Sequence, residues 1–386
     1  MKNKGKWLVA LMLVLGIIIG VAVQELRFTK TMSAKSLESI LHAYNIAKDR
    51  SVNEFTEQQL VDGMISGLAG MLEDDYAHYY TAEELVKHND DKNGIIRGGI
   101  GVVITSTEEG IVITEVYPDS PAQKVGMKAG DVFLAVDDTS VVGLDADALS
   151  QLVGGENGTE VKIRVRRGSD EIIFNPVRAL VTAPMVKYRQ IEDITYIEFL
   201  SFNGNAVEKF TEAIKSAEEA NAKGIIIDLR DNLGGSLDIL AKTADLILPE
   251  GDIIYAMDRY GNRISEKKSD ASRIEKPIVI LTNAYSASAS EAFTGAARDH
   301  AVAITVGTRT YGKGIMQTTY NLPNDGAFKL TTAKYYLPKG ECIQGVGITP
   351  DHVVQLPGGV ESRPADMTDA EDTQLQKALE LLRAEA

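Results

Sequence analysis

Residues 276–293 read KPIVILTNAYSASASEAF and contain the most informative change of pattern in the chain. An apolar, β-branched run ends in small polar residues and passes into an alanine-rich segment, which predicts a buried strand, a turn and a helix. Ser288 lies at this transition, where the first amides of the helix lack partners within the helix. The pattern therefore predicts an α/β layer with a serine at the carboxyl end of one of its strands.

Strand-like and helix-like segments alternate from about Val181 through this region. Such alternation predicts an α/β domain in which helices pack on a layered sheet. Because sites in such domains form at the carboxyl ends of strands, we expect chemistry in the loops DLRDNLGG (228–235) and NAYSASAS (283–290). The segments are strand-like at 194–202, 224–230, 277–283 and 301–307, and helix-like at 205–223, 236–248 and 288–299.

Upstream of the α/β region the pattern changes twice. Apolar residues between positions 32 and 93, such as Ile40, Leu41 and Met64, recur at three- and four-residue intervals and predict helices with a buried face. From Gly94, short alternating strands separated by turns predict a small β-rich module. We therefore expect a multi-domain α/β protein. The expected boundaries are 1–30 for a signal or anchor, 31–92 for the helical segment, 93–179 for the β-rich module, 180–358 for the α/β core and 359–386 for a peripheral tail helix.

Composition and charge exclude two classes of function. The 44% hydrophobic content is that of a globular protein. A formal net charge of −15 offers no gathered basic surface for a phosphate backbone, so no nucleic-acid partner is expected. Cys342 is the single cysteine, so the chain forms neither an intrachain disulfide nor a multi-thiolate metal site.

The N-terminus carries the signature of export. Lys2, Lys4 and Lys6 precede an uncharged apolar run of 17 residues from Trp7 to Val23. No A-x-A arrangement of small residues follows the run, which favours an uncleaved membrane anchor over a cleaved signal. The rest of the chain is then expected outside the cytoplasmic membrane, tethered to it, or secreted if the signal is cleaved.

Two short lysine motifs match known patterns only in part. Residues 307–313 spell the G-x-x-x-x-G-K of a phosphate-binding loop, but Gly314 lacks the hydroxyl that would hold magnesium and a strand-like run follows. Ser265 and Lys268 spell S-x-x-K within GNRISEKKSD (261–270), which predicts a polar loop without a helix to hold the pair. Neither motif is expected to carry chemistry.

As a nucleophile, Ser288 needs a base, and both histidine and lysine are candidates. His300 and His352 are the candidate histidines, but no G-x-S-x-G elbow surrounds Ser288 and His300 lies at a predicted helix end. Lys313 lies between two glycines, which let other backbone approach it closely. A Ser-Lys dyad requires a neutral amine, and lowering a lysine pKa from about 10.4 to about 7 corresponds to about 4.6 kcal/mol, which buried sites sustain.

Ser288 also has a purely structural interpretation. The residues from Ser288 to Glu291 spell S-x-x-E, a capping box in which the serine satisfies the first amides of a helix. The local sequence does not distinguish the nucleophile from the cap.

A glycine-rich segment, RGGIG at 97–101, opens the β-rich module, and DSPAQKVGMKAGDVFLAVDD follows at 119–138. Glycines let successive backbone amides point at a carboxylate with no side chain in the way. With these motifs the module resembles a bacterial PDZ domain, which captures a peptide by adding it as a strand to a sheet edge. The resemblance implies a loop for the peptide's terminal carboxylate at Gly98, Gly99, Ile100 and Gly101.

From about Leu37 to Leu356 the chain is similar to the carboxyl-terminal processing peptidases, also called tail-specific proteases. The motifs occur in the family's order: EDDYAHYYT (73–81), the PDZ module, DLRDNLGG, NAYSASASEAF (283–293), GTRTYGKGIMQT (307–318), LTTAKYYLPKG (330–340) and GVGITPD (345–351). The resemblance implies Ser288 as nucleophile, Lys313 as base and Gln317 as the residue that assists the lysine. It also implies an oxyanion hole formed by the amides of Gly234 and Ala289. The chain departs from the family at Leu233, where proline is usual, and has Cys342 at a variable position.

This resemblance implies a serine endopeptidase that binds the carboxyl-terminal tail of protein substrates through its PDZ domain and cleaves through an acyl-enzyme. The expected partners are proteins or peptides with free, often apolar carboxyl termini, and the membrane through the N-terminal anchor. No metal or organic cofactor is required, and assembly into a homo-oligomer is left open. The alternative is a membrane-tethered PDZ adaptor whose protease core is inactive.

Overall fold

The computed structural model describes residues 32–364 and 367–385. It contains two compact units, Met1–Tyr79 and Tyr80–Ala386. The signal or anchor predicted at residues 1–30 lies outside the described residues. Among the helices of the described part, none is long and apolar enough to cross a membrane.

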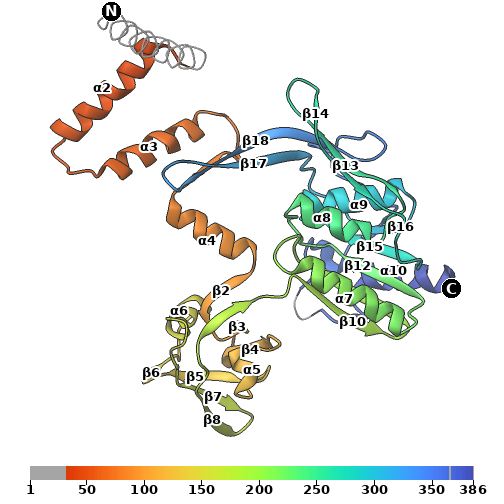
Figure 1. Ribbon diagram of the computed structural model, residues 1–386. Coiled ribbons are helices and arrows are strands. Elements are labelled where there is room, and N and C mark those ends of the chain that lie inside the picture. Colours follow the sequence, from red (N-terminus) through yellow and green to blue (C-terminus); the bar gives the residue numbers. More distant parts are fainter. Residues whose placement is uncertain (1–31, 365–366, 386) are drawn as a thin grey trace, which may run out of the picture. The chain divides into compact units, whose positions relative to one another are not determined.

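The described part of the first unit consists mainly of two helices, α2 (Ala34–Arg50) and α3 (Glu57–Gly70) (Figure 1). Ser33 caps the start of α2, and Thr56 caps α3 in a capping box with Gln59. These caps explain why the helices begin where they do. The prediction of helices in this segment is confirmed.

The buried face predicted for these helices is wrong. α2 has no buried residue, and the side chains of Ile40, Leu41 and Met64 are between 41% and 53% exposed. Apolar side chains of both helices line a groove of 670 Å³ instead. A helical period places an apolar face, but it does not say whether another element covers that face.

The β-rich module is confirmed as a small domain. β1 (His78–Tyr80) and α4 (Ala82–Lys92) precede it in the chain. Its elements are β2 (Ile95–Gly99), β3 (Val102–Thr107), β4 (Gly110–Val116), α5 (Pro121–Lys124), β5 (Val132–Val136), β6 (Thr139–Ser140), α6 (Ala146–Val153), β7 (Ile163–Arg167), β8 (Asp170–Phe174) and β9 (Ala179–Thr182). An antiparallel sheet runs in the order β3-β4-β5-β7-β8, and β2 pairs with β9. Ile113, Leu149 and Ile163 are fully buried in its core.

The α/β core alternates strands and helices as predicted. Its elements are β10 (Val186–Ile191), β11 (Ile194–Phe199), α7 (Ala206–Glu219), β12 (Gly224–Asp228), α8 (Leu237–Asp245), β13 (Gly251–Met257), β14 (Arg263–Ser269), β15 (Ile278–Thr282), α9 (Ala289–Asp299), β16 (Ala303–Gly307), β17 (Ile315–Asn321), β18 (Ala327–Tyr336), β19 (His352–Val353), the 3-10 helix η1 (Pro357–Gly359) and α10 (Thr373–Glu385). The main sheet runs β10-β11-β12-β15-β16-β19 and is parallel except at β10.

Helices cover both faces of the main sheet, so its central strands are buried on both sides. Every residue of β12 is buried, as expected for a parallel strand with a continuous apolar run. Ile225 and Ile227 pack in the cluster that includes α7, α8 and α9, whereas Ile226 packs with α10 on the other face. Figure 1 shows the helices on the two sides of these strands.

The tail helix forms, but it is not peripheral. Leu375, Leu379 and Leu382 of α10 are at most 3% exposed. They pack against the main sheet, with Val279 and Leu281 of β15 among their neighbours. The expectation of a peripheral helix is therefore wrong, because the charged residues of the tail occupy one side of a helix whose other side is core.

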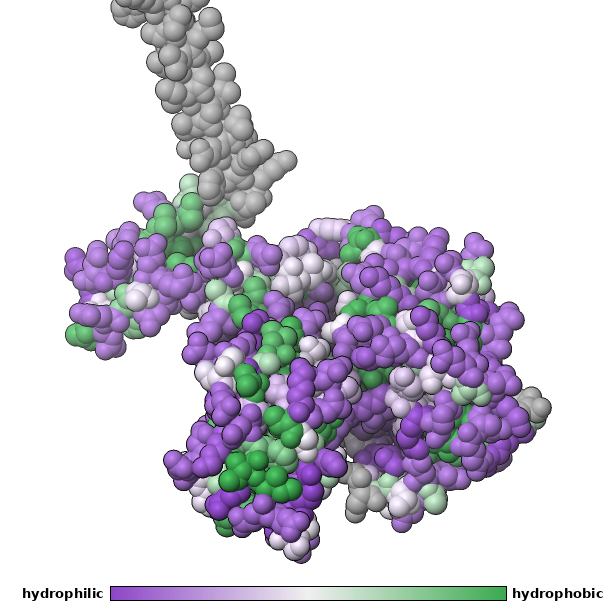
Figure 2. Space-filling model, turned by 60° about the horizontal axis from the view of Figure 1, so that its bottom comes forward, coloured by the Kyte–Doolittle hydropathy of each residue, from purple (hydrophilic) through white to green (hydrophobic). Residues whose placement is uncertain are grey.

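A second, antiparallel sheet contains β17, β18, β13 and β14. The segment 261–270, predicted as a polar loop, contains the whole of β14 instead. Its alternating side chains are partly exposed, which explains the polar composition. Most of the surface shown in Figure 2 is hydrophilic, in keeping with the net charge of −15.

Candidate active site

Ser288 lies on a strained turn between β15 and α9. The strand ends at Thr282 and the helix begins at Ala289, as the sequence predicts. Ser288 has φ 58° and ψ −113°, a backbone conformation that residues other than glycine rarely adopt. A sharp strand-to-helix turn of this kind exposes the nucleophile of other serine hydrolases. The G-x-S-x-G motif is missing from the sequence around Ser288, but the sharp turn that this motif usually forms is present.

Two loops at the carboxyl ends of parallel strands meet at this turn. β12 and β15 are paired in parallel, so the loops that follow them lie side by side. Asn232 O accepts hydrogen bonds from Ala287 N at 3.0 Å and from Ser290 Oγ at 2.7 Å. The structure thus joins the segments 228–235 and 283–290, which the sequence singled out separately.

Gly234 packs directly against the Ser288 turn. It has φ 97°, and a Cβ atom at this position would lie 2.6 Å from Ala287 O and 2.7 Å from Ala289 N. No other residue fits here. The N–H of Gly234 donates to Asn232 Oδ1 at 2.9 Å. Both residues predicted for the oxyanion hole are therefore beside Ser288, with the Gly234 amide bonded to Asn232.

Glu291 connects the Ser288 turn to the loop that carries Lys313. Its carboxylate is fully buried and accepts four hydrogen bonds. Oε2 accepts from Ser288 N at 2.9 Å and from Lys313 N at 2.8 Å. Oε1 accepts from Gly312 N at 2.7 Å and from Thr310 Oγ1 at 2.6 Å. One carboxylate oxygen therefore bridges the backbone amides of the predicted nucleophile and the predicted base.

Lys313 lies on the loop between β16 and β17, as expected from its neighbouring glycines. Gly312 has φ 93°, and a Cβ there would lie 3.0 Å from Gly347 N. A Cβ at Gly314 would lie 2.6 Å from Gln344 N. Close backbone approach, the role expected of the glycines, is confirmed at both positions.

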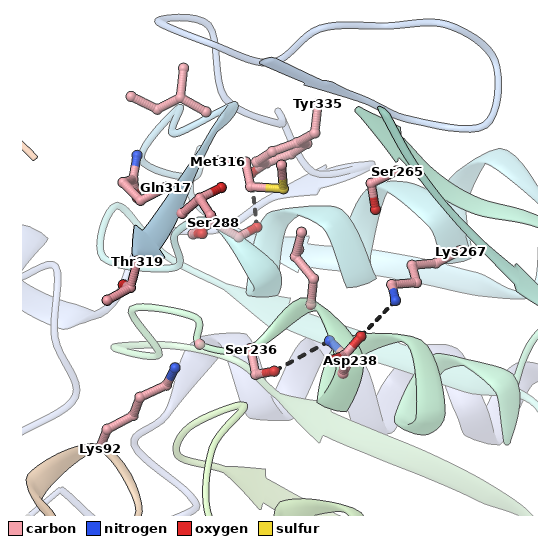
Figure 3. A pocket seen from close by; sticks show the side chains of 14 residues that line it. Lys92, Ser236, Asp238, Ser265, Lys267, Ser288, Met316, Gln317, Thr319 and Tyr335 are labelled. Carbon is pink, nitrogen blue, oxygen red and sulfur yellow. Dashed lines mark hydrogen bonds and ion pairs between the residues drawn. The ribbon is translucent and has the colours of Figure 1, made fainter. Parts of the chain in front are cut away.

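A cavity of 420 Å³ opens beside Ser288 (Figure 3). Met316 and Gln317 of β17 and Tyr335 of β18 line it together with Ser288, whereas Lys313 is not among its lining residues. Gln317 Nε2 donates to Thr331 Oγ1 at 3.1 Å, across the pair of strands. The cavity thus contains the predicted nucleophile and the residue predicted to assist the base.

The opposite wall of this cavity is polar. Ser236 and Asp238 at the start of α8 and Lys267 of β14 line it. Lys267 Nζ pairs with Asp238 Oδ1 at 2.6 Å (Figure 3). This ion pair lowers the pKa of the Asp238 carboxyl. Among the described residues, no group of three or more His, Cys, Asp or Glu side chains is placed to hold a metal ion.

Arg230 anchors the loop that leads to Gly234. Its side chain is 2% exposed and pairs with Asp228 Oδ2 at 2.5 Å and with Asp372 Oδ2 at 2.9 Å. Burial by itself lowers the pKa of Arg230, but the two carboxylates outweigh burial and raise it. Because Asp372 directly precedes α10, the C-terminal helix helps to hold this loop.

Three family profiles match the chain: "Peptidase family S41" at residues 193–354, "PDZ domain" at residues 112–167 and "Activating protease CtpB N-terminal domain" at residues 21–84. A "Carboxy-terminal-processing protease" of Bartonella bacilliformis is 35% identical over 321 residues, which cover 81% of this chain and 73% of that protein. The chain belongs to peptidase family S41.

Two further comparisons agree with this assignment. A "Probable CtpA-like serine protease" of Staphylococcus haemolyticus is 34% identical over 326 residues, covering 84% of this chain and 66% of that protein. The solved structure of a photosystem II D1 C-terminal processing protease has 25% sequence identity and a TM-score of 0.50, covering 82% of this chain and 88% of the other. The resemblance seen in the motifs is confirmed: this is a serine-type peptidase of family S41 with a PDZ domain.

The PDZ domain of this S41 chain places its glycine-rich loop against a cavity of 230 Å³. Residues 98–101 line it together with Phe133 and Val153. Gly98 has φ 64°, and a Cβ there would lie 1.6 Å from Gly155 O. The N–H of Gly98 donates to Asn157 Oδ1 at 2.7 Å. The loop predicted to bind a carboxylate is thus next to an apolar cavity, with the amide of Gly98 bonded to an asparagine side chain.

The competing bases predicted from the sequence lie elsewhere. His300 is the C-cap of α9, and its Nε2 lies 2.8 Å from Asp252 O. His352 is on β19, at the edge of the main sheet. Ser265 lines the cavity beside Ser288, but it lies with Lys268 on a strand rather than in the predicted loop. The two residues are three positions apart, so their side chains point to opposite faces of the strand.

The sequence interpretation missed the wider role of Glu291. The sequence assigned Glu291 only to the last position of a capping box. Its bond to Ser288 N is indeed the reciprocal half of such a box. Its bonds to Thr310, Gly312 and Lys313 join segments about 20 residues apart. The signal available in the sequence was an acidic residue within an alanine-rich helix, since such a residue requires several polar partners when it is buried.

Proposed function

We propose that this S41 chain is an endopeptidase that cleaves proteins through a Ser288–Lys313 dyad, after its PDZ domain has bound their carboxyl-terminal tail. The observation that carries the proposal is the bridge made by Glu291. One buried carboxylate oxygen holds the amides of Ser288 and Lys313 at 2.9 Å and 2.8 Å, beside a cavity that Ser288 lines. A residue that only caps the helix would not need the second bond, from Lys313 N to Glu291 Oε2.

In the proposed mechanism a neutral Lys313 amine accepts the proton of Ser288 Oγ as that oxygen attacks the carbonyl carbon of the scissile peptide bond. Collapse of the tetrahedral intermediate breaks the C–N bond, and the Lys313 ammonium returns the proton to the leaving amine. Water then attacks the acyl-enzyme, with Lys313 again accepting and returning a proton. Gln317, which lines the cavity beside Ser288, orients the lysine.

The oxyanion of each intermediate is assigned to the amides of Ala289 and Gly234. Ala289 is the first residue of α9, where the helix dipole favours negative charge. Gly234 contributes once its N–H turns from Asn232 Oδ1 to the oxyanion. The close packing of Gly234 against this turn supports the pairing, because even a Cβ at Gly234 would lie only 2.7 Å from Ala289 N.

The PDZ domain supplies selectivity in this proposal. A free carboxylate binds at the amides of residues 98–101, and the last apolar side chain enters the cavity lined by Phe133 and Val153. The polypeptide that precedes this tail is delivered to Ser288, so capture and cleavage are coupled. A cleavage rate unchanged by deletion of residues 94–178 would contradict the coupling.

We further propose that the enzyme works outside the cytoplasmic membrane, tethered by its N-terminal run. Lysines followed by 17 uncharged apolar residues support this location. Fractionation of cells that express the full chain tests it: the protein should stay with membranes and be accessible to external protease. Release into the medium would show that the run is a cleaved signal.

The deciding experiment follows cleavage of a protein that ends in a free apolar carboxylate. Ser288→Ala and Lys313→Ala should each lower the rate about 10⁴-fold or more, since both groups act in the same step. Ser272→Ala and Lys334→Ala, which change exposed residues, serve as matched controls and should leave the rate unchanged.

Each other outcome has a defined meaning. Activity that survives Lys313→Ala would redirect the assignment of the base to a histidine. A wild-type chain that binds the tail without cutting it would support the inactive PDZ adaptor instead. Amidation of the substrate's carboxyl terminus should slow cleavage without affecting Ser288 itself, which separates tail recognition from chemistry.

A further inference from the structure

The hydroxyl of Tyr335 lies between the two residues of the proposed dyad. Tyr335 is on β18, is 1% exposed and lines the cavity beside Ser288 (Figure 3). Its Oη lies 3.0 Å from Ser288 O and is also hydrogen-bonded to Lys313 O. The hydroxyl therefore contacts the carbonyl groups of both residues.

This contact complements the bridge made by Glu291. Glu291 Oε2 accepts hydrogen bonds from the backbone N–H groups of Ser288 and Lys313, and the single O–H of Tyr335 is shared between their C=O groups. Ser288 O also accepts the first helical bond, from Ala292 N at 3.0 Å. The helix thus fixes the Ser288 carbonyl, and Tyr335 connects the Lys313 carbonyl to it.

We propose that Tyr335 is a positioning residue of this active site: its hydroxyl holds the Lys313 loop in register with the Ser288 turn and orients the Ala289 amide. This inference rests on the proposed Ser-Lys function. The peptide group between Ser288 and Ala289 is planar and trans, so its C=O and N–H point in opposite directions. A hydrogen bond that fixes the carbonyl therefore also fixes the direction of the N–H assigned to the oxyanion.

Tyr335 acts without transferring a proton. Its burial, together with the negative charge of Glu291, raises the pKa of the hydroxyl well above the ordinary value. The hydroxyl therefore stays protonated, and remains a donor, at neutral pH and up to its ordinary pKa of 10.0. Loss of the hydroxyl should therefore lower the rate without changing the pH at which the rate rises.

The test uses Tyr335→Phe in the full chain, with a peptide substrate that ends in a free apolar carboxylate. We expect kcat to fall about 10- to 100-fold, less than the loss on removing an oxyanion donor outright, with KM within about twofold. The pH profile of kcat/KM should keep its midpoint. Affinity for a peptide aldehyde, whose adduct with Ser288 carries the oxyanion, should fall in parallel with kcat/KM.

Tyr336→Phe is the matched control. Tyr336 is the next residue of the same strand, and its ring stacks on Tyr255 with centroids 5.3 Å apart. Its loss of a hydroxyl should leave kcat unchanged. Placing 4-aminophenylalanine at position 335 retains a donor and should restore most of the rate, which a general loss of packing would not allow.

Three results would overturn the role of Tyr335: a wild-type kcat in Tyr335→Phe, a shifted pH midpoint, or an equal loss with 4-aminophenylalanine. Rates are normalised to Ser288 sites titrated by a fluorophosphonate, so a partly unfolded variant is not mistaken for a slow one. Failure of the dyad itself has a different signature, because Ser288→Ala or Lys313→Ala would then cleave as fast as the wild type.

Discussion

The Ser288 site and the glycine loop of the PDZ domain share one backbone arrangement but differ in how deeply its partners are buried. In each, a glycine with positive φ has no room for a Cβ, and its N–H donates to an asparagine side chain: Gly234 to Asn232, and Gly98 to Asn157. Asn232 is fully buried, whereas Asn157 is exposed. Around Ser288 the buried carboxylate of Glu291 ties the backbone together; beside Gly98 the ion pair of Arg97 and Asp90 lies at the surface.

The difference matches the role proposed for each site. Acyl transfer requires a nucleophile, a base and amide donors held within a fraction of an ångström, and buried hydrogen bonds to a charged group give that rigidity. A loop that receives many tails needs amides that can exchange an exposed asparagine for a carboxylate. Four substitutions test this contrast.

The largest effect is expected from Glu291→Gln. The new amide places an N–H₂ group against backbone N–H donors, so the Ser288 turn and the Lys313 loop separate. A displacement of about 1 Å between reacting groups costs about 100-fold in rate, and an unsatisfied buried donor costs about 1–3 kcal/mol of stability. Peptide cleavage and thermal unfolding measure both effects. Glu341→Gln, which removes an ion pair with Arg298, is the control, and equal behaviour of the two variants would contradict the bridge.

Gly98→Ala should affect tail binding more than cleavage chemistry. The added Cβ would meet Gly155 O at 1.6 Å, so backbone must shift, at a cost of about 2–4 kcal/mol. Binding of an apolar carboxyl-terminal peptide to the Ser288→Ala chain, followed by fluorescence anisotropy, should weaken about tenfold or more.

Gly126→Ala is the matched control for this change. Gly126 has φ 86° in the same domain, but a Cβ there would meet no atom within 4 Å. This substitution should lower the free energy of unfolding by about 1–2 kcal/mol, through backbone strain alone, and leave the peptide affinity unchanged. Equal loss of affinity in both variants would show that strain alone, and not the crowded loop, controls binding.

Ser288→Gly should give a more stable protein than Ser288→Ala, and under the proposed mechanism neither variant should cleave. Both remove the hydroxyl, but only glycine adopts φ 58° without strain. We expect a difference of about 1 kcal/mol in favour of glycine, measured by thermal unfolding. Equal stability would show that the turn around Ser288 is not strained.

The smallest effect concerns Asp90. Arg97, through its hydrogen bond and charge, lowers the pKa of Asp90 below its ordinary value of 3.8. Because this pKa is lower in the folded protein, the stabilisation is complete above the ordinary pKa and is lost as the pH falls through the lowered value. The difference in melting temperature between wild type and Asp90→Asn should therefore shrink from about pH 6 to about pH 2.5. A constant difference would exclude the ion pair as its cause.

Local pattern was enough to place most elements of this protein. The β-branched run at 278–282 became β15 and the alanine-rich run became α9, because strand and helix periods are properties of consecutive residues. The same reasoning failed at 261–270, where a polar composition hid the edge-exposed strand β14. It also failed for the covering of helix faces: α2 was expected to be buried and is not, whereas α10 was expected to be peripheral and is core.

The sequence by itself determined the order of the domains, the family of the chain, and which serine, lysine and glycines to examine, because these follow from residue type and spacing. Only the tertiary structure decided how Ser288 and Lys313 are joined. Their connection runs through Glu291 and Tyr335. The bonds from Lys313 N to Glu291 and from Tyr335 to Ser288 O and Lys313 O join residues about 20 to 50 positions apart, and such bonds leave no period in a sequence. The positive φ of Ser288 is likewise a result of packing, since no serine adopts it unless the surrounding turn imposes it.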